Sequence, residues 1–224
     1  TTPYTLFYAA LGKNGPTVVE VPAGALAGSA MDFWQRALTD FGLTGPDQGQ
    51  GAKYLFVGPG QETPEMQDAI IVKSPTLTVF SFYRALDPDP EKAEALKKGV
   101  RIYPWSERDN PRLTRFLEPD PDQVKNMRPT PRGLDYWSCL AQVIDEEPVQ
   151  DRDRFFVSML RTLGIEKGHP FQPNEHQKKI LEDAAFVGEA MAKANSFDKR
   201  FAGSRYRDDA NWDYVIMADP AQDL

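Results

Sequence analysis

The sequence has few of the residues that most often build catalytic or metal sites. Its 224 residues include one cysteine and two histidines. Cys139 cannot form a disulfide within the chain, and its position beside Trp137, Leu140 and Val143 in a helical pattern predicts a buried, unreactive thiol. A disulfide-stabilised scaffold is therefore excluded within this chain.

The two histidines, His169 and His176, lie on either side of Pro170 and Pro173. This spacing is not that of a helical histidine pair, and the chain has no pair of cysteines two residues apart. A catalytic zinc site needs three well-placed ligands. We therefore expect two solvated histidines, no metal and no cofactor.

Positive charge and long apolar runs are also scarce. The formal net charge is -7 and the isoelectric point is about 5.0. The arginine-rich stretch 101–132 is interleaved with acidic residues, so it lacks the clustered positive charge that phosphate backbones require. No apolar run approaches the roughly 18 residues of a membrane span. We expect neither nucleic-acid binding nor a membrane span.

Glycine is concentrated in Gly45–Gly60 (GPDQGQGAKYLFVGPG). A phosphate-binding loop needs Gly-Lys followed by Ser or Thr at the start of a helix, but here Lys53 is followed by Tyr54 and a strand pattern. A dinucleotide-binding loop would follow a strand and open a helix, which is the reverse order. The segment is interpreted as a loop that shapes the backbone. No nucleophile elbow is present either.

Strand patterns dominate the first half of the chain. Residues 5–11 and 17–21 predict two strands, joined as a hairpin by a turn at 13–16. Apolar residues at helical spacing predict a helix over about 30–41. Further strands are expected at 53–57, 69–73, 76–84 and 100–105, with a helix from 89 to 99. Both faces of 76–84 carry apolar residues, which favours a central strand.

The second half is helical. After a proline-rich charged stretch at 106–132, we expect helices at 134–147, 152–163 and 175–195, each with a buried apolar face. Asn174 and Gln177 form a capping box for the last. A final strand is expected at 212–218. The fold class is α+β: a β-rich barrel-like or sandwich part (1–128) packed against a three-helix part (129–200), with 201–224 leading to a further domain.

One cluster of aromatic and cationic residues is the candidate ligand site. Arg84, Arg101, Tyr103 and Trp105 end two strands that we expect to be neighbours. Arginine among amphipathic rings is typical of a cleft that holds an anionic or aromatic small molecule. The same residue types also make contacts between domains. Pocket and interface both remain open at this point.

Several ordered segments resemble a bacterial family known as domain of unknown function 1254. They are GPTVVEVP (15–22), DFWQRALTDFGLTGPDQGQGAKYLFVGPG (32–60), SPTLTVFSFYRAL (74–86), IYPW (102–105), PRGLDYW (131–137), DRDRFF (151–156), LGIEKGHPF (163–171) and WDYVI (212–216). The resemblance implies a two-domain protein in which a β-rich domain of unknown function 1214 follows, so that this chain is a fragment. It also implies export to the periplasm, and it carries over no catalytic residue.

Two function classes follow. The first is a small-molecule binder or enzyme that uses the cluster of Arg84, Arg101, Tyr103 and Trp105. The second is a structural or interaction module that docks a second β-rich domain or subunit. An enclosed pocket lined by those four side chains would favour the first, and a solvent-open aromatic face the second. We also expect a homo-oligomer.

Overall fold

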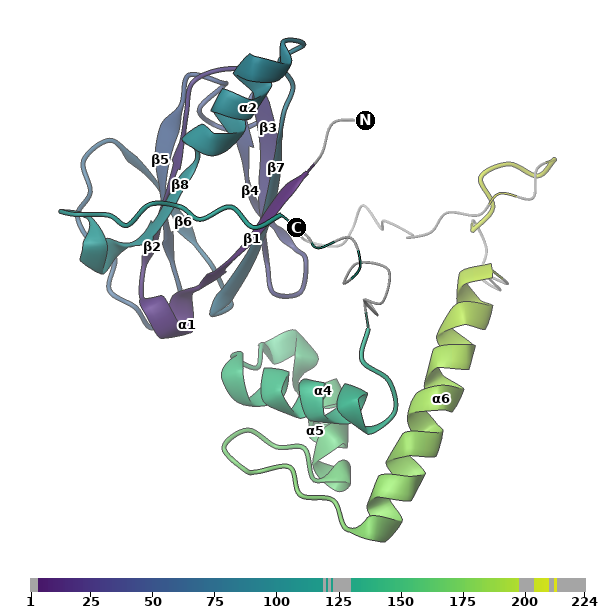
Figure 1. Cartoon of the computed structure of the whole chain (residues 1–224). Coiled ribbons are helices and arrows are strands. Elements are labelled where there is room, and N and C mark those ends of the chain that lie inside the picture. The colour runs from purple at the N-terminus through teal and green to yellow at the C-terminus, as the bar shows by residue number, and fades with distance from the viewer. Residues whose placement is uncertain are drawn as a thin grey trace. The chain divides into compact units, whose positions relative to one another are not determined.

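The computed structural model describes residues 4–118, 120, 122, 130–197, 204–209 and 212. The chain divides into two compact units (Figure 1): Thr1–Pro121 with Glu146–Pro148, and Asp122–Asp145 with Val149–Leu224. The first is built of strands and the second of helices. The predicted α+β class is confirmed.

Two four-stranded sheets form the first unit. The first sheet has the order β1-β7-β3-β4 and the second the order β6-β5-β2-β8. The strands are β1 (Thr5–Ala10), β2 (Thr17–Val21), β3 (Leu26–Asp32), β4 (Ala37–Gly42), β5 (Ala52–Val57), β6 (Ala69–Lys73), β7 (Thr78–Ala85) and β8 (Arg101–Pro104). All pairs are antiparallel except β5 with β6. The sheets pack as a sandwich, so the sandwich alternative holds and the barrel does not.

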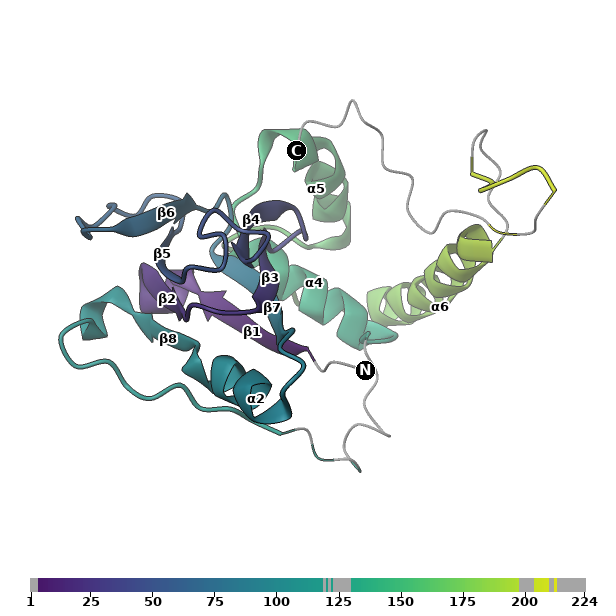
Figure 2. The same ribbon diagram turned by 90° about the horizontal axis from the view of Figure 1, so that it is seen from above.

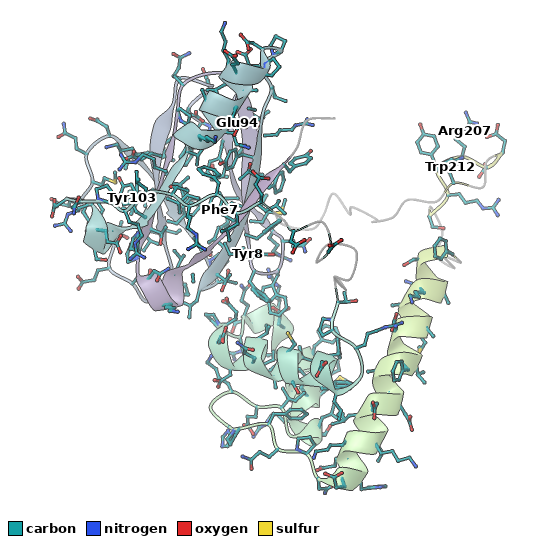
Figure 3. All side chains as sticks on the ribbon, in the orientation of Figure 1. Phe7, Tyr8, Glu94, Tyr103, Arg207 and Trp212 are labelled. Carbon is teal, nitrogen blue, oxygen red and sulfur yellow. The ribbon has the colours of Figure 1, made fainter. Side chains whose placement is uncertain are left out.

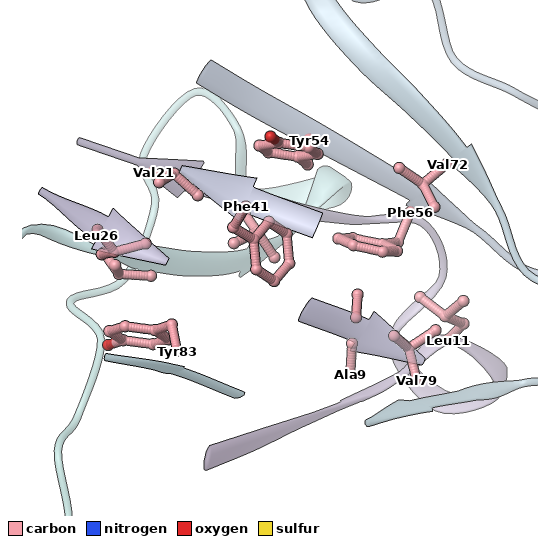
Figure 4. Close-up of a cluster of buried hydrophobic side chains, with 13 residues drawn as sticks. Ala9, Leu11, Val21, Leu26, Phe41, Tyr54, Phe56, Val72, Val79 and Tyr83 are labelled. Atoms are coloured by element: carbon pink, nitrogen blue, oxygen red, sulfur yellow. The ribbon is translucent and has the colours of Figure 1, made fainter. Parts of the chain in front are cut away.

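The core lies between the two sheets (Figure 4) and is built by the alternation of side chains along each strand. Phe41 from the first sheet packs edge-to-face on Tyr54 and Phe56 from the second, with ring centroids 5.0 and 6.2 Å apart. The remaining buried members are aliphatic or aromatic: Ala9, Leu11, Val19, Val21, Leu26, Ala30, Val72, Val79, Tyr83 and Val100. Strand β7 lies between β1 and β3, as its two apolar faces predicted.

The helix predicted over 30–41 is wrong, because this segment forms the hairpin β3–β4. Asp32 closes the hairpin turn: its Oδ1 accepts hydrogen bonds from the backbone N–H groups of Trp34 (2.8 Å) and Arg36 (2.9 Å). Gln35 adopts a positive φ of 61° in that turn. The strand conformation also places Phe41 in the core, which offsets the helical preference.

The predicted hairpin between residues 5–11 and 17–21 is also wrong. Strand β1 belongs to the first sheet and β2 to the second. Between them lies the one-turn helix α1 (Leu11–Asn14), whose Leu11 is fully buried, and Gly15 follows with a φ of 74°. The chain thus uses this turn to pass from one sheet to the other.

The glycine-rich segment shapes the backbone, as interpreted from the sequence. At Gly45 a Cβ atom would lie 2.6 Å from the Asp40 carbonyl oxygen. Gly51 has a φ of 78°, and a Cβ atom there would lie 2.6 Å from the Ala23 nitrogen. These contacts exclude larger residues, so the glycines let neighbouring loops touch.

Helix α2 (Pro90–Gly99) follows β7 and leads into β8 (Figure 2). Its start matches the prediction: Asp89 caps it by accepting a hydrogen bond from the Glu91 N–H at 3.0 Å, and Pro90 is the first helical residue. Because β7 and β8 belong to different sheets, α2 is a crossover between the sheets. The two strands are not neighbours, and that expectation is corrected.

The helical unit contains α4 (Leu134–Glu146), the 3₁₀ turn Asp151–Asp153, α5 (Arg154–Leu160), the 3₁₀ turn Arg161–Leu163 and α6 (Glu175–Phe197). The capping box is confirmed, since Asn174 and Gln177 exchange side chain–backbone hydrogen bonds of 2.8 and 2.9 Å. No helix in the described part of the chain is both long and apolar enough to cross a membrane. The strand expected at 212–218 falls outside the described residues, apart from Trp212.

Burial predictions are wrong on all three helices, since Ile180, Val187 and Met191 of α6 are exposed. Cys139 is exposed. It lies five residues before the buried Ile144, which is about 140° around the helix and therefore on another face. Phe155, Phe156 and Met159 of α5 are exposed as well.

Candidate functional site

A row of charged residues crosses the outer face of the second sheet. Strand register places Glu20 of β2 opposite Lys53 of β5 on one side and Arg101 of β8 on the other. The Glu20 carboxylate lies 3.5 Å from Lys53 Nζ and 3.2 Å from Arg101 Nη1. Tyr103, two residues after Arg101, donates its hydroxyl to Glu20 Oε1 at 2.6 Å. These four residues form the Glu20 cluster.

The Glu20 cluster is satisfied by its own members. Burial, and then the hydrogen bond to Glu20, raise the pKa of Tyr103 to about 12, so its hydroxyl stays a neutral donor. The Arg101 guanidinium lies 5.6 Å from the centroid of the Tyr103 ring. Beneath the cluster Tyr103 packs with Val18 and Leu55 in a small core of its own. The arrangement fixes the Arg101 and Tyr103 side chains in place.

An open groove of about 530 Å³ adjoins Glu20 and Lys53. Its other lining residues are Val21, Pro22, Ala23, Gln50, Gly51, Ala52, Gln67, Asp68 and Gly99. A neighbouring hollow of about 380 Å³ shares Pro22 and Ala23 and continues to Leu96 on α2. The charged side chains that line the groove are two acids, Glu20 and Asp68, and one base, Lys53, so the groove has no excess of positive charge.

The four predicted ligand residues are divided between the sheets. Arg101 and Tyr103 lie on β8 of the second sheet, and Trp105 begins the 3₁₀ turn that follows it. The Trp105 ring packs against the small core, and the Arg108 guanidinium lies 4.7 Å from its centroid. Arg84 lies on the first sheet, with its guanidinium 5.3 Å from the centroid of the Tyr4 ring. None of the four is among the described residues that line the groove.

A second surface was not recognised from the sequence. On the outer face of the first sheet, Leu6 of β1 lies opposite Phe82 of β7, and Tyr8 opposite Phe80. Leu6 is 60% and Tyr8 69% exposed. Tyr8 points away from the sandwich, whereas the adjacent Phe7 packs on its core (Figure 3). We call the residues Tyr4, Leu6, Tyr8, Phe80 and Phe82 the aromatic face.

The rings of the aromatic face contact one another. Tyr4 and Phe82 meet edge-on at 5.8 Å, Tyr8 and Phe80 lie 5.2 Å apart, and Phe80 and Phe82 lie 5.9 Å apart. Cross-strand aromatic pairs of this kind hold each other in fixed positions. The sequence signal was the apolar outer row of 76–84. That apolar row predicts a central strand equally well. Only the exposure of Leu6 and Tyr8 in the structure identifies the surface.

The first unit, which contains the two sheets, is similar to a known protein family. Residues 1–104 match the model of a family described as "Protein of unknown function (DUF1254)". We call these matched residues the DUF1254 part. The match extends from β1 to β8, so both the Glu20 cluster and the aromatic face lie within the DUF1254 part.

The DUF1254 part and the helices together resemble a solved structure. The crystal structure of the VPA0106 protein from Vibrio parahaemolyticus superposes with a TM-score of 0.63 at 14% identity. The match covers 87% of this chain and 48% of that one, so this chain spans about half of its length. At this identity the likeness shows the fold alone. No curated protein matches the chain.

Outside the DUF1254 match, the two histidines are both exposed. His169 lies in the loop before α6, and its Nδ1 is 3.2 Å from the Lys167 carbonyl oxygen. His176 lies in the first turn of α6. No group of three or more metal-ligating side chains occurs among the residues that the structure describes.

Proposed function

We propose that the chain is an interaction module and that the aromatic face binds an apolar surface of a protein partner. One observation carries this proposal: two adjacent strands of an antiparallel sheet present a row of large apolar side chains to solvent. In such sheets the face away from the core is normally polar. Contiguous exposed apolar patches are typical of protein–protein contacts.

The composition of the aromatic face also suits a protein partner. Aromatic residues and arginine are enriched in the centres of interfaces, whereas lysine and acidic residues are depleted. The face consists of four rings and one leucine, and the Arg84 guanidinium lies over one of these rings, that of Tyr4. Full burial of one such side chain contributes about 1.5–3 kcal/mol. Several acting together can support a specific complex.

A small-molecule site at the predicted cluster has weaker support. Arg101 and Tyr103 already interact with Glu20, so a ligand would have to replace internal contacts. An anionic ligand in the adjoining groove would also face Glu20 and Asp68 with only Lys53 to neutralise it. The solvent-open aromatic face agrees better with the interaction hypothesis.

Site-specific photo-crosslinking in the native host tests the proposal. A benzophenone amino acid replaces Tyr8, and the matched control replaces Ile71, which is an exposed apolar residue on edge strand β6 of the other sheet. We expect a discrete adduct heavier than the chain from position 8 and none from position 71. Absence of an adduct at position 8, or an adduct that leaves the mass of the chain unchanged, refutes the proposed function.

A further inference from the structure

The four edges of the two sheets are protected to different degrees. Strands β1 and β4 are the edges of the first sheet, and β6 and β8 those of the second. An edge strand exposes unpaired backbone N–H and C=O groups that can pair with another chain. Proteins therefore protect such edges with charges, prolines, bulges or covering segments. Comparing the edges shows where pairing is still possible.

Three edges carry such protection. On β8, the Ile102 N–H donates to the Thr114 hydroxyl at 2.9 Å, and the strand ends at Pro104. On β4, a register shift interrupts the ladder with β3, and Asp40 adds a charge. Strand β6 has five residues and ends at Lys73.

The remaining edge, β1, has none of these features. Its six residues (TLFYAA) include no charge, no proline and no glycine. Its register with β7 runs without interruption from Thr5 to Ala10. Within the described part of the chain, β7 is its only paired neighbour. Strand β1 is thus an uncharged edge with an uninterrupted register, and it also carries Leu6 and Tyr8 of the aromatic face.

We propose that β1 pairs antiparallel with β1 of a second copy of this chain, which joins the first sheets of the two copies into one continuous sheet. This inference rests on the proposed function, because the pairing brings a second copy of the chain beside Leu6 and Tyr8 of the aromatic face. Self-pairing of a strand brings its own charges close to their copies, and like charges that face each other are destabilising. A strand without charge has no such cost.

The alternation of side chains restricts the register. Residues directly opposite each other must point to the same face, so the two-fold axis passes through a residue and not between two. An axis at Phe7 pairs every residue from Tyr4 to Ala10, up to the start of α1. Leu6 then lies opposite Tyr8 of the second copy, at the roughly 5 Å Cβ separation of a cross-strand pair. The aromatic faces of the two copies become continuous.

The first experiment measures association of the full chain by sedimentation equilibrium. We expect a reversible dimer in the micromolar range. Leu6→Lys adds a charge at an exposed position and should raise the dimer dissociation constant at least tenfold without unfolding the protein. Ile71→Lys makes an equivalent change on the β6 edge and should leave the constant unchanged. A chain that stays monomeric up to about 100 μM overturns the pairing. A dimer that Leu6→Lys does not weaken overturns it as well.

The second experiment tests the register. Leu6→Cys and Tyr8→Cys are made separately in a Cys139→Ser background, and the two proteins are mixed under mild oxidation. The Phe7 register places these two cysteines opposite each other, so a mixed disulfide should form. Two Leu6→Cys chains would lie two residues out of register, about 7 Å along the strand and 5 Å across it, which is beyond disulfide reach. Equal or faster crosslinking of Leu6→Cys with itself overturns the register.

The photo-crosslink at position 8 separates failure of this inference from failure of the proposed function. An adduct of twice the chain's mass supports both. A discrete adduct of any other mass supports the interaction module and overturns self-pairing. No adduct at all refutes both.

Discussion

Removing the Tyr54 hydroxyl tests whether the contact between the sheets depends on one buried charge-assisted hydrogen bond. Tyr54 and Asp47 are both buried, and the Tyr54 hydroxyl donates to Asp47 Oδ1 at 2.6 Å. The same oxygen accepts the Gly42 N–H at 2.7 Å. Asp47 thereby joins strand β5 to the end of β4. Burial and the hydrogen bond to Asp47 raise the pKa of Tyr54, so the hydroxyl remains a donor.

Tyr54→Phe keeps the ring and its edge-to-face contact with Phe41, so the measured loss reports the hydroxyl alone. A hydrogen bond to a charged group contributes about 1.5–3 kcal/mol, and we expect a loss of unfolding free energy in that range. Asp47→Ala should cost more, about 3–5 kcal/mol, because it leaves the buried Tyr54 hydroxyl and the Gly42 N–H both without an acceptor.

The assay is native-state amide hydrogen exchange of β2 and β5, which reports opening of the sandwich and not of the helices. The double variant completes a thermodynamic cycle. Once Asp47 is absent, Tyr54→Phe should cost nothing further or restore stability, since it removes an unsatisfied hydroxyl. An equal cost of Tyr54→Phe in both backgrounds, or a cost below about 0.5 kcal/mol in the wild type, would show that the hydrogen bond does not stabilise the sandwich.

Two further predictions concern the same unit. Gly42→Ala should destabilise the strand-built unit by more than about 2 kcal/mol, because its Cβ would overlap the Leu26 carbonyl. Gly60→Ala, at a similar φ with open space around it, should cost only about 1 kcal/mol. The urea midpoints of the two variants compare these costs directly. Burial raises the pKa values of Tyr83 and Tyr103 to about 12, so absorbance at 295 nm should show two tyrosines that ionise near that pH. Since these folded-state pKa values exceed the ordinary tyrosine value of about 10, the stabilisation that they represent is present below pH 10 and is lost as the pH rises through 12.

The sequence predicted secondary structure correctly where the residues of one segment determine its conformation without contacts from the rest of the chain. Residues 69–73 form a strand with the predicted bounds, and α2 (Pro90–Gly99) matches the helix predicted from 89 to 99. The segment 30–41 shows the limit of such signals. Its apolar residues occur at helical spacing, but Asp32 can cap a hairpin turn as readily as a helix, and only the packing of Phe41 against the opposite sheet selects the strand.

The candidate site failed for a topological reason. Arg84 lies near the end of β7 and Arg101 at the start of β8, and these segments follow each other closely along the chain, which suggested adjacent strands. Helix α2 carries the chain from one sheet to the other, and no local pattern distinguishes that crossover from a return to the same sheet. Glu20 was missed because a single acid in a strand is unremarkable until the register places Lys53 and Arg101 beside it.

The aromatic face and the β1 edge make separate demands on a partner. A strand added at the β1 edge lies beside Leu6 and Tyr8, in the plane of the sheet. It does not cover Phe80 and Phe82, which belong to the next strand inward, about 5 Å further from the seam. Self-pairing therefore widens the exposed apolar surface instead of removing it.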